Sequence, residues 1–231
     1  MYKNKKILAV VMARGGSKGI INKNLRKIGK SSLVYLAGKI CTSIKYIDKS
    51  MVSTDSIKIG REAKRSGLNF FFLRPKKLSG GKIPDQDVLK HALIKAEIKY
   101  KTKFDFILSI PPTTPTRTNV EVTSALKKTI DKKFDSLWTI SLTDNKYHPD
   151  KSLKIEKNKL KFYNKAGNKI IYRQQLSDIY HRNGVAYIIR RNLIKNKIII
   201  NKNTGFLISK SKHISIDSLE DLKLAKKILL S

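Results

Sequence analysis

Short apolar runs with β character alternate with longer amphipathic patterns along this chain, and this alternation restricts the fold more than any other feature. The run at 7–12 is followed at 31–44 by apolar residues spaced three and four apart, and the order repeats up to residue 140. Strands that alternate with helices predict a sheet of mainly parallel strands flanked by crossover helices, an α/β fold. We expect strands at 7–12, 49–53, 69–73, 106–110, 136–140, 185–189 and 214–216, and helices at 31–44, 56–67, 87–100, 119–130 and 218–230.

The segment 141–184 departs from this pattern. It is polar and rich in lysine, and its β-like pieces are short. Because no linker rich in Pro, Gly or Ser separates it from its surroundings, we expect one domain over 1–231 with an inserted β-rich subdomain or arm at about 141–184. In α/β sheets ligands bind beyond the carboxyl ends of the strands, so functional residues are expected in the loops that follow the strands.

The net charge of +33 at pH 7 points first to nucleic-acid binding. The excess consists of 40 Lys against 10 Arg spread over the whole chain, and the common nucleic-acid-binding motifs are missing. Scattered surface charge is usually solvated, which argues against nucleic acid as the main partner and favours anionic small molecules. One cysteine, Cys41, and the lack of any run of about 20 apolar residues predict a cytoplasmic protein with no membrane span.

Residues 13–24, which read ARGGSKGIINKN, follow the first expected strand and combine glycines with cations. They miss the dinucleotide pattern GxGxxG because Arg14 stands at its first position. A P-loop reading of the later IGKSS fails because Asn24 stands where a glycine is required. The loop nevertheless offers what a triphosphate needs, since glycines let backbone N–H groups approach phosphate oxygens and the cations supply positive charge.

This loop opens a series of segments that spans nearly the whole chain. The series is ILAVVMARGGSKGIINKNLRKIGKSSLV at 7–34, MVSTDSIKIGREAKRSG at 51–67, FLRPKKLSG at 72–80, DVLKHAL at 87–93, LSIPPTTPTRT at 108–118, YRQQLSDIYHRNGVAYII at 172–189 and ISIDSLEDLKLAKKIL at 214–229. In this order the segments resemble the acylneuraminate cytidylyltransferases, the CMP-sialic acid synthetase-like enzymes that couple CTP to sialic acid and related 2-keto sugar acids.

The resemblance implies a Rossmann-like nucleotide-diphospho-sugar transferase fold and a nucleotidyl transfer. The anomeric hydroxyl of an acidic 2-keto sugar, of the nonulosonic type, would attack the α-phosphate of CTP and release pyrophosphate. Such chemistry depends on positioning and on charge neutralisation more than on a protein nucleophile. The family is commonly a homodimer, so the resemblance also implies that the 141–184 arm reaches a partner subunit.

The resemblance also assigns the nucleotide site. Arg14, Lys18 and Lys23 would act on the triphosphate. Arg74 would sit near the base; a surface arginine at a strand end is the less favoured alternative. The remaining nucleotide-binding positions would be Ala13, Gly15, Gly16, Ser17, Gly19 and Asn24.

For the acceptor, the resemblance places Arg173 on the sugar carboxylate, which a guanidinium meets with two hydrogen bonds. The other sugar-binding candidates are Lys151, Tyr187 and Gln175, and for Lys151 a solvated surface role is at least as plausible. Asp217 would hold Mg²⁺, the expected cofactor, unless it serves only as an acid at a helix N-terminus.

Two departures from the family pattern leave alternatives open. Ser215 stands where the family often has a second aspartate, and Pro111 stands where it often has a glutamine that contacts the sugar. The second change predicts retained CTP chemistry with an acceptor other than N-acetylneuraminate, since proline offers no side-chain hydrogen bond. A cytidylyltransferase for the eight-carbon acid Kdo, and a non-catalytic or nucleic-acid-binding relative, are the alternatives.

Overall fold

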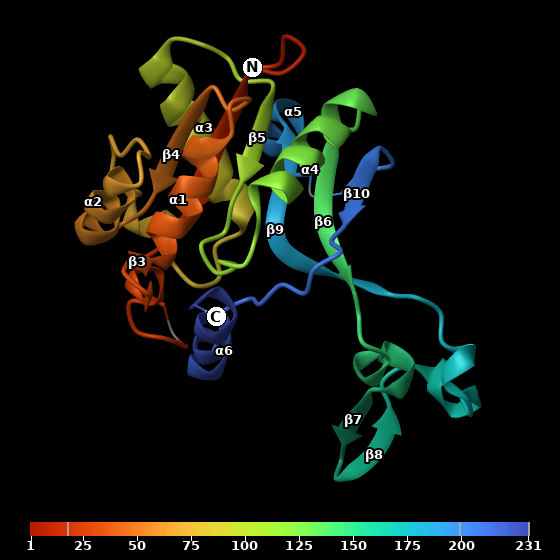
Figure 1. The fold of residues 1–231 in the computed structure, drawn as a ribbon. Coiled ribbons are helices and arrows are strands. Elements are labelled where there is room, and N and C mark those ends of the chain that lie inside the picture. Colours follow the sequence, from red (N-terminus) through yellow and green to blue (C-terminus); the bar gives the residue numbers. More distant parts are fainter. Residues whose placement is uncertain (18, 199, 231) are drawn as a thin grey trace.

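The structure, a computed structural model, describes residues 1–17, 19–198 and 200–230. Among these residues, six strands form one central sheet in the order β10-β6-β9-β5-β1-β4 (Figure 1). They are β1 (Ile7–Met12), β4 (Lys49–Ser53), β5 (Phe106–Ser109), β6 (Ser136–Leu142), β9 (Tyr180–Arg190) and β10 (Thr204–Ile208). The pairs β1–β4, β1–β5 and β6–β10 are parallel, whereas β9 runs antiparallel to both of its neighbours. The predicted mainly parallel α/β sheet is confirmed.

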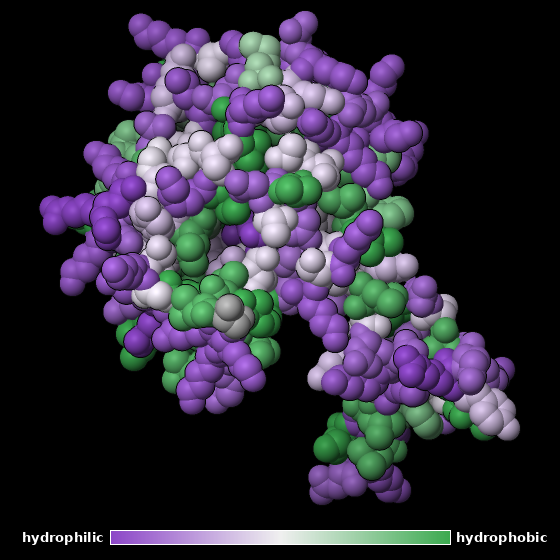
Figure 2. Space-filling view, in the orientation of Figure 1, coloured by the Kyte–Doolittle hydropathy of each residue, from purple (hydrophilic) through white to green (hydrophobic). Residues whose placement is uncertain are grey.

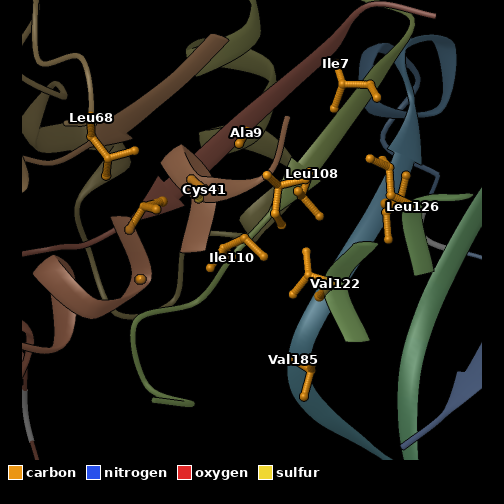
Figure 3. Packing of buried hydrophobic residues seen from close by; sticks show 14 of the residues in the cluster. Ile7, Ala9, Cys41, Leu68, Leu108, Ile110, Val122, Leu126 and Val185 are labelled. Atoms are coloured by element: carbon orange, nitrogen blue, oxygen red, sulfur yellow. The ribbon is translucent and has the colours of Figure 1, made fainter. Parts of the chain in front are cut away.

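The described part of the chain holds six α-helices. They are α1 (Leu33–Ser43), α2 (Ile57–Arg65), α3 (Asp85–Tyr100), α4 (Asn119–Asp131), α5 (Arg191–Lys195) and α6 (Leu219–Leu230). The first five flank the sheet, and α6 packs on a separate cluster with Ile20 and Ile28. Alternate residues of β1 point to opposite faces: Ile7 and Ala9 join a core with α1, α2 and α4 (Figure 3). Leu8 and Val10 join a second core with α3 and α5. The helices therefore cover both faces of the sheet, as crossover connections require.

Local sequence signals explain where the main helices begin. The Ser32 hydroxyl caps α1 by accepting a hydrogen bond from the backbone N–H of Tyr35. Thr118 and Glu121 form a reciprocal capping box at α4. At α6 the Ser218 hydroxyl accepts from the N–H of Asp221, and the Asp221 carboxylate accepts from the N–H of Ser218.

Two expected strands are wrong. At 69–73 the described chain forms only an isolated bridge, between Met51 and Asn69. The phenylalanines that follow pack on opposite faces of the sheet, Phe70 in the core with α2 and Phe71 and Phe72 in the core with α3. At 214–216 it makes single hydrogen bonds to the loop after β5, with Ile216 N–H donating to the Thr113 carbonyl. The strand β10, which pairs with β6 at the sheet edge, was not expected from the sequence.

The segment 141–184 leaves the sheet where β6 and β9 extend beyond it, and it projects away from the body (Figure 1). Its hairpin consists of β7 (Leu153–Glu156) and β8 (Lys159–Phe162), joined at two residues with positive φ. Every residue of both strands is exposed. Figure 2 shows apolar residues gathered on this hairpin. We call 141–184 the arm; its status as a subdomain within a single domain stays a prediction.

Candidate active site

The loops that follow β1 and β5 open onto a cavity of about 480 Å³, which we call the glycine-loop cavity. Its lining includes Arg14, Ser17, Gly19, Lys23 and Asn24 from the loop after β1, together with Arg74, Gly80, Gly81, Asp85, Pro111, Thr113 and Asp217. Such a location, beyond strand ends of an α/β sheet, is where these folds bind ligands. The sequence prediction of a site at the 13–24 loop is therefore consistent with a real concavity.

Two buried or half-buried polar groups fix the backbone of this loop. The Asn24 side-chain amide donates to the Arg14 carbonyl at 2.9 Å, and the Gly15 N–H donates to Asp55 Oδ1 at 2.8 Å. At Gly19 an added Cβ would lie 2.9 Å from the Asp217 carbonyl oxygen, so only glycine lets the loop approach that segment so closely. Ala13 is buried, while Gly16 has open space around it. Lys18 lies outside the described residues.

Lys23 joins this loop to the segment before α6. Its Nζ donates to the Ile216 carbonyl and to Asp217 Oδ1, both at 2.8 Å. The other carboxylate oxygen of Asp217 accepts a long hydrogen bond of 3.4 Å from the Ser215 hydroxyl. The Asp217 side chain is 75% exposed, so the lysine does not enclose it. No group of three His, Cys, Asp or Glu side chains suited to a metal occurs in the described ranges.

Arg74 is the most unusual cation of the cavity because it is buried without hydrogen bonds. The residue is 5% exposed, and neither Nε nor Nη2 has a hydrogen-bond partner among the described residues. The nearest carboxylate oxygen, Asp55 Oδ1, lies 3.9 Å from Nη2. Burial lowers the pKa of Arg74, with the neighbouring Arg14 acting in the same direction and Asp55 opposing it. The interpretation of Arg74 as a surface residue is wrong, and a buried arginine with unpaired donors points to a ligand.

A second cavity, of about 300 Å³, adjoins the first; we call it the aromatic cavity. Trp138 and Tyr187, paired across β6 and β9, pack edge to face with ring centroids 5.3 Å apart. The Arg182 guanidinium lies 5.4 Å from the centroid of the Trp138 ring, a cation–π distance. Burial raises the pKa of Tyr187, which keeps its phenol neutral. The aromatic cavity thus offers one exposed cation, Arg182, beside aromatic and apolar side chains and the polar groups of Asp85, Gln86 and Ser109.

The arm residues assigned to the acceptor lie elsewhere. Arg173 and Gln175 belong to one short 3-10 turn, and Lys151 ends another. None of the three lines either cavity in the described part of this chain. Gln175 Oε1 accepts from the N–H groups of Ile171 and Tyr172, which commits its amide to the turn. Of the predicted sugar-binding residues, one chain by itself brings only Tyr187 to a cavity.

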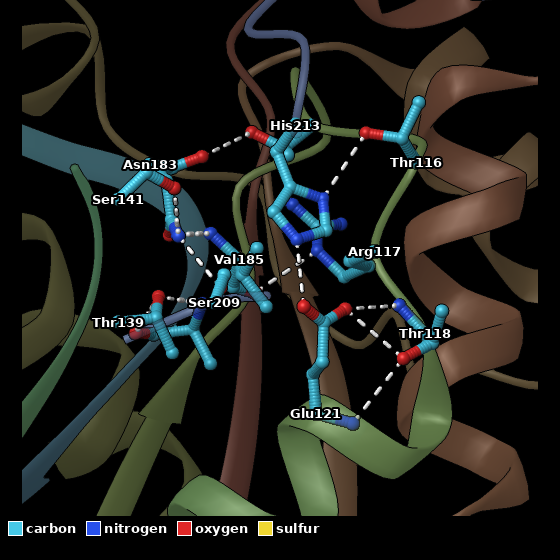
Figure 4. Close-up of polar contacts among 12 residues, drawn as sticks. Thr116, Arg117, Thr118, Glu121, Thr139, Ser141, Asn183, Val185, Ser209 and His213 are labelled. Carbon is cyan, nitrogen blue, oxygen red and sulfur yellow. Dashed lines mark hydrogen bonds and ion pairs between the residues drawn. The ribbon is translucent and has the colours of Figure 1, made fainter. Parts of the chain in front are cut away.

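A buried polar network joins the loop after β5 to β9 (Figure 4). Arg117 donates to the carbonyls of Val185, Gly184 and Pro111, and its burial lowers its pKa to about 10. An added Cβ at Gly184, whose φ is 72°, would lie 2.5 Å from the Thr114 hydroxyl. These contacts fasten the loop after β5, which lines the glycine-loop cavity, to the strand that carries the aromatic cavity.

Sequence reasoning missed four residues that the structure brings to the site: Asp55, Asp85, Trp138 and Arg182. They come from four different parts of the chain, and although Asp55 and Arg182 lie within the family-like segments 51–67 and 172–189, no single motif contains all four. A usable signal existed for Arg182, since this chain has only ten arginines. Trp138 is its single tryptophan.

Comparison with known proteins agrees with this architecture. Residues 8–229 match the protein family described as "Cytidylyltransferase". The chain is 30% identical over 223 residues to a CMP-N,N'-diacetyllegionaminic acid synthase of Campylobacter jejuni, covering 95% of this chain and 93% of that protein. It is 28% identical to an N-acylneuraminate cytidylyltransferase of Escherichia coli, covering 95% of this chain and 51% of that protein.

Among solved structures, a CMP:2-keto-3-deoxy-manno-octonic acid synthetase in complex with CTP superposes with a TM-score of 0.69. The two chains share 14% sequence identity, and the match covers 97% of this chain and 98% of that one. This likeness bears on the fold alone. The family match over residues 8–229 and the similarity to the curated relatives show that the chain belongs to the cytidylyltransferase family of CMP-sialic acid synthetase-like nucleotidyltransferases.

Proposed function

We propose that this protein couples CTP to a nonulosonic acid, a nine-carbon 2-keto sugar acid, and forms a CMP-sugar and pyrophosphate. The observation that carries the proposal is the pair of adjoining cavities, which share Met12 and Asp85. One is walled by cations and glycines, as a triphosphate requires, and the other by aromatic rings and one arginine. A nucleotide in the first and a sugar acid in the second would meet at the shared boundary.

In the glycine-loop cavity, Arg14 and Lys23 would neutralise the triphosphate, and the backbone N–H groups of the loop would donate to its oxygens. Lys18 stays a predicted third cation. Arg74 would donate its unpaired Nε and Nη2 to the acceptor atoms of cytosine, which presents a ring nitrogen and a carbonyl oxygen on one edge. Satisfying a buried, unpaired guanidinium would contribute to binding of the base.

Mg²⁺ belongs to the proposal, with Asp217 as its protein ligand. Mg²⁺ at nucleotide sites is usually held by one or two carboxylates and by phosphate oxygens, so a single exposed carboxylate in the cavity fits. When bound, the ion would offset negative charge that builds up on the phosphates. Lys23, hydrogen-bonded to the same carboxylate, would hold Asp217 toward the cavity.

In the aromatic cavity, Tyr187 and Trp138 would pack on the sugar and Arg182 would meet an anionic group. The relatives differ in their printed acceptors, and Pro111 removes a side-chain donor from this neighbourhood. We therefore propose a nonulosonic acid other than N-acetylneuraminate, of the diacetamido type that the Campylobacter jejuni relative is named for.

A homodimer is also part of the proposal, because the arm exposes a set of large apolar side chains. Leu153, Ile155 and Leu160 are 53%, 75% and 69% exposed. Burying such a surface against a second copy would remove it from water and could bring the arm's Arg173, Lys151 and Gln175 to the partner's aromatic cavity. Sedimentation of the whole protein would test this, with a monomer contradicting it. The location in a cytoplasm remains a proposal, supported by the buried free thiol of Cys41.

Measuring pyrophosphate release with CTP and Mg²⁺ tests the function. Diacetamido nonulosonic acids, N-acetylneuraminate and Kdo are compared as acceptors, and ATP and UTP replace CTP as controls. We expect the highest kcat/KM with CTP and a diacetamido acid. A preference for N-acetylneuraminate would contradict the acceptor assignment, and a preference for Kdo would favour that alternative. No release with any acceptor, together with salt-sensitive binding of RNA or DNA, would favour a binding protein.

A further inference from the structure

Asp85 lies at the boundary between the glycine-loop cavity and the aromatic cavity. It is the first residue of α3, and the only described residues that line both cavities are Asp85 and Met12. Any bond formed between ligands in the two cavities must form near this boundary. Of the two side chains only the carboxylate of Asp85 can accept a proton.

The other carboxylates near the site are already engaged. Asp217 pairs with Lys23 at 2.8 Å, and Asp55 accepts from the Gly15 N–H. Asp87, two residues along the same helix, forms an ion pair with Lys197 at 2.6 Å. The Asp85 side chain, in contrast, makes no hydrogen bond or ion pair with any residue that the structure describes. Its oxygens are therefore available to a ligand.

The charged and titratable groups around Asp85 come from three elements. The positive charges of Arg182, on β9, and of Arg74, in the loop before α3, favour the ionised form of Asp85 and lower its pKa. The negative charge of Asp85 in turn raises the pKa of Tyr187 on β9. Crowding by protein atoms raises the pKa of Asp85, while the two arginines oppose that rise. Asp85 is exposed, so its carboxyl group is open to solvent through the cavities. An ionised carboxylate with unengaged oxygens at this boundary can accept a proton from a ligand's hydroxyl.

We propose that Asp85 is the general base of the nucleotidyl transfer, an inference that rests on the function proposed above. The anomeric hydroxyl of the sugar acid gives its proton to the Asp85 carboxylate as its oxygen forms a bond to the α-phosphorus of CTP. The bond between that phosphorus and the bridging oxygen of pyrophosphate breaks, and pyrophosphate leaves with the electron pair. Arg182 offsets the carboxylate of the acceptor, so that two negative groups can share the boundary.

The test compares Asp85→Asn with Asp87→Asn in the whole protein. Both substitutions remove a carboxylate from the first turn of α3, so any effect on the helix is shared. For Asp85→Asn we expect kcat to fall by about 10²- to 10⁴-fold, the range for loss of a general base, with the KM for CTP unchanged. Asp87→Asn should keep kcat within about threefold, as surface substitutions usually do. Asp85→Glu should restore part of the activity.

The pH profile separates proton transfer from a structural role. In the wild-type protein kcat should fall at acid pH as Asp85 is protonated. The midpoint of this fall should lie above pH 3.8, because the pKa of Asp85 is raised from its ordinary value of 3.8. Asp85→Asn should lack this acidic limb. Equal kcat for wild type and Asp85→Asn would overturn the proposal, and so would recovery of the variant by added Mg²⁺, which would indicate a metal ligand. A wild-type protein inactive with every nonulosonic acid would instead overturn the proposed function itself.

Discussion

The two cavities lie next to each other but are built in different ways. The glycine-loop cavity draws its cations and backbone donors mainly from one contiguous loop, supported by Asn24 and the buried Arg74. The aromatic cavity is assembled from single side chains on α3, β5, β6 and β9, which lie far apart in sequence. The first construction suits a ligand that carries several negative charges close together, such as a triphosphate. The second can change its ligand by substitutions at individual positions, without disturbing the loop.

Arg14→Met should have the largest effect on the glycine-loop cavity, because it removes a cation from the loop itself. We expect kcat to fall by about 10²- to 10³-fold, as when one preorganised donor to a developing charge is lost. The KM for the sugar acid should stay unchanged. Steady-state kinetics with varied CTP and varied acceptor check both statements.

The matched control is Arg61→Met, which removes an exposed arginine from α2. It carries the same change in charge and should leave kcat and both KM values as they are. If Arg14→Met raised the KM for the acceptor as strongly as it lowered kcat, the two cavities could not be assigned to separate ligands.

Arg182→Gln should have the largest effect on the aromatic cavity, which Arg182 lines. Loss of a charge-assisted contact worth about 1.5–3 kcal/mol would raise the KM for the sugar acid by about 10- to 100-fold and leave the KM for CTP unchanged. Arg173→Gln tests the competing assignment, since the family resemblance places the carboxylate of the sugar acid on that arm residue. A rise in KM for Arg173→Gln alone would show that the partner's arm, and not this chain's own β9, binds the acceptor carboxylate.

Gly81→Ala is a smaller change to the glycine-loop cavity. An added Cβ at Gly81 would lie 3.0 Å from Arg14 Nη1, so the guanidinium must shift by a few tenths of an ångström. Because misplacement by a full ångström costs about 10²-fold, we expect a loss of only about 3- to 10-fold in kcat/KM for CTP. At Gly80 an added Cβ would meet only Ile83, at 3.5 Å. Equal losses for Gly80→Ala and Gly81→Ala would contradict the role given to the position of Arg14.

The difference between the cavities also explains how far the sequence could predict this molecule. Periodicity identified the strand at Ile7–Met12 and the strand at Lys49–Ser53 with their observed bounds. The first is a continuous apolar run, and the second is a short β-like segment that precedes an amphipathic pattern. It failed at 69–73, where "NFFFL" has strand composition but Phe70 packs with α2, the next two rings pack with α3, and the backbone forms one isolated bridge. Strand β10 was not predicted; it is a five-residue strand at the sheet edge, and two of its residues are exposed.

The same limit applies to the site. Arg14, Lys23 and Asn24 could be predicted because they lie within ten residues of one another after a strand. Arg182 and Trp138 could not, since they meet only when β6 and β9 pair, with a bulge between Trp138 and Ile140 that changes the register. Asp85 carries no sequence signal of its own, because an aspartate at the first turn of a helix is common. Its place between two cavities follows only from the tertiary fold.

The smallest predicted effect concerns the buried hydrogen bonds of His213, close to the segment that lines the glycine-loop cavity. The His213 side chain, fully buried, hydrogen-bonds to Glu121 Oε1 at 2.7 Å and to the Thr116 hydroxyl at 3.3 Å (Figure 4). This holds the segment that leads to Asp217 against the start of α4. Although burial by itself would raise it, the pKa of Glu121 is lowered, because His213 and the two donors of Thr118 favour the carboxylate.

Since the folded-state pKa of Glu121 lies below its ordinary value of 4.5, its stabilising contribution is fully present above pH 4.5 and is lost as the pH falls through the lowered value. Glu121→Gln should therefore lower the free energy of unfolding by about 1–2 kcal/mol at pH 7, as loss of a charged hydrogen bond does. Urea unfolding should show the difference from wild type shrinking at acid pH. Glu220→Gln, at an exposed position of α6, is the control and should show no such difference. A gap between Glu121→Gln and wild type that stays constant down to acid pH would mean that the ionised carboxylate is not what fastens the Asp217 segment.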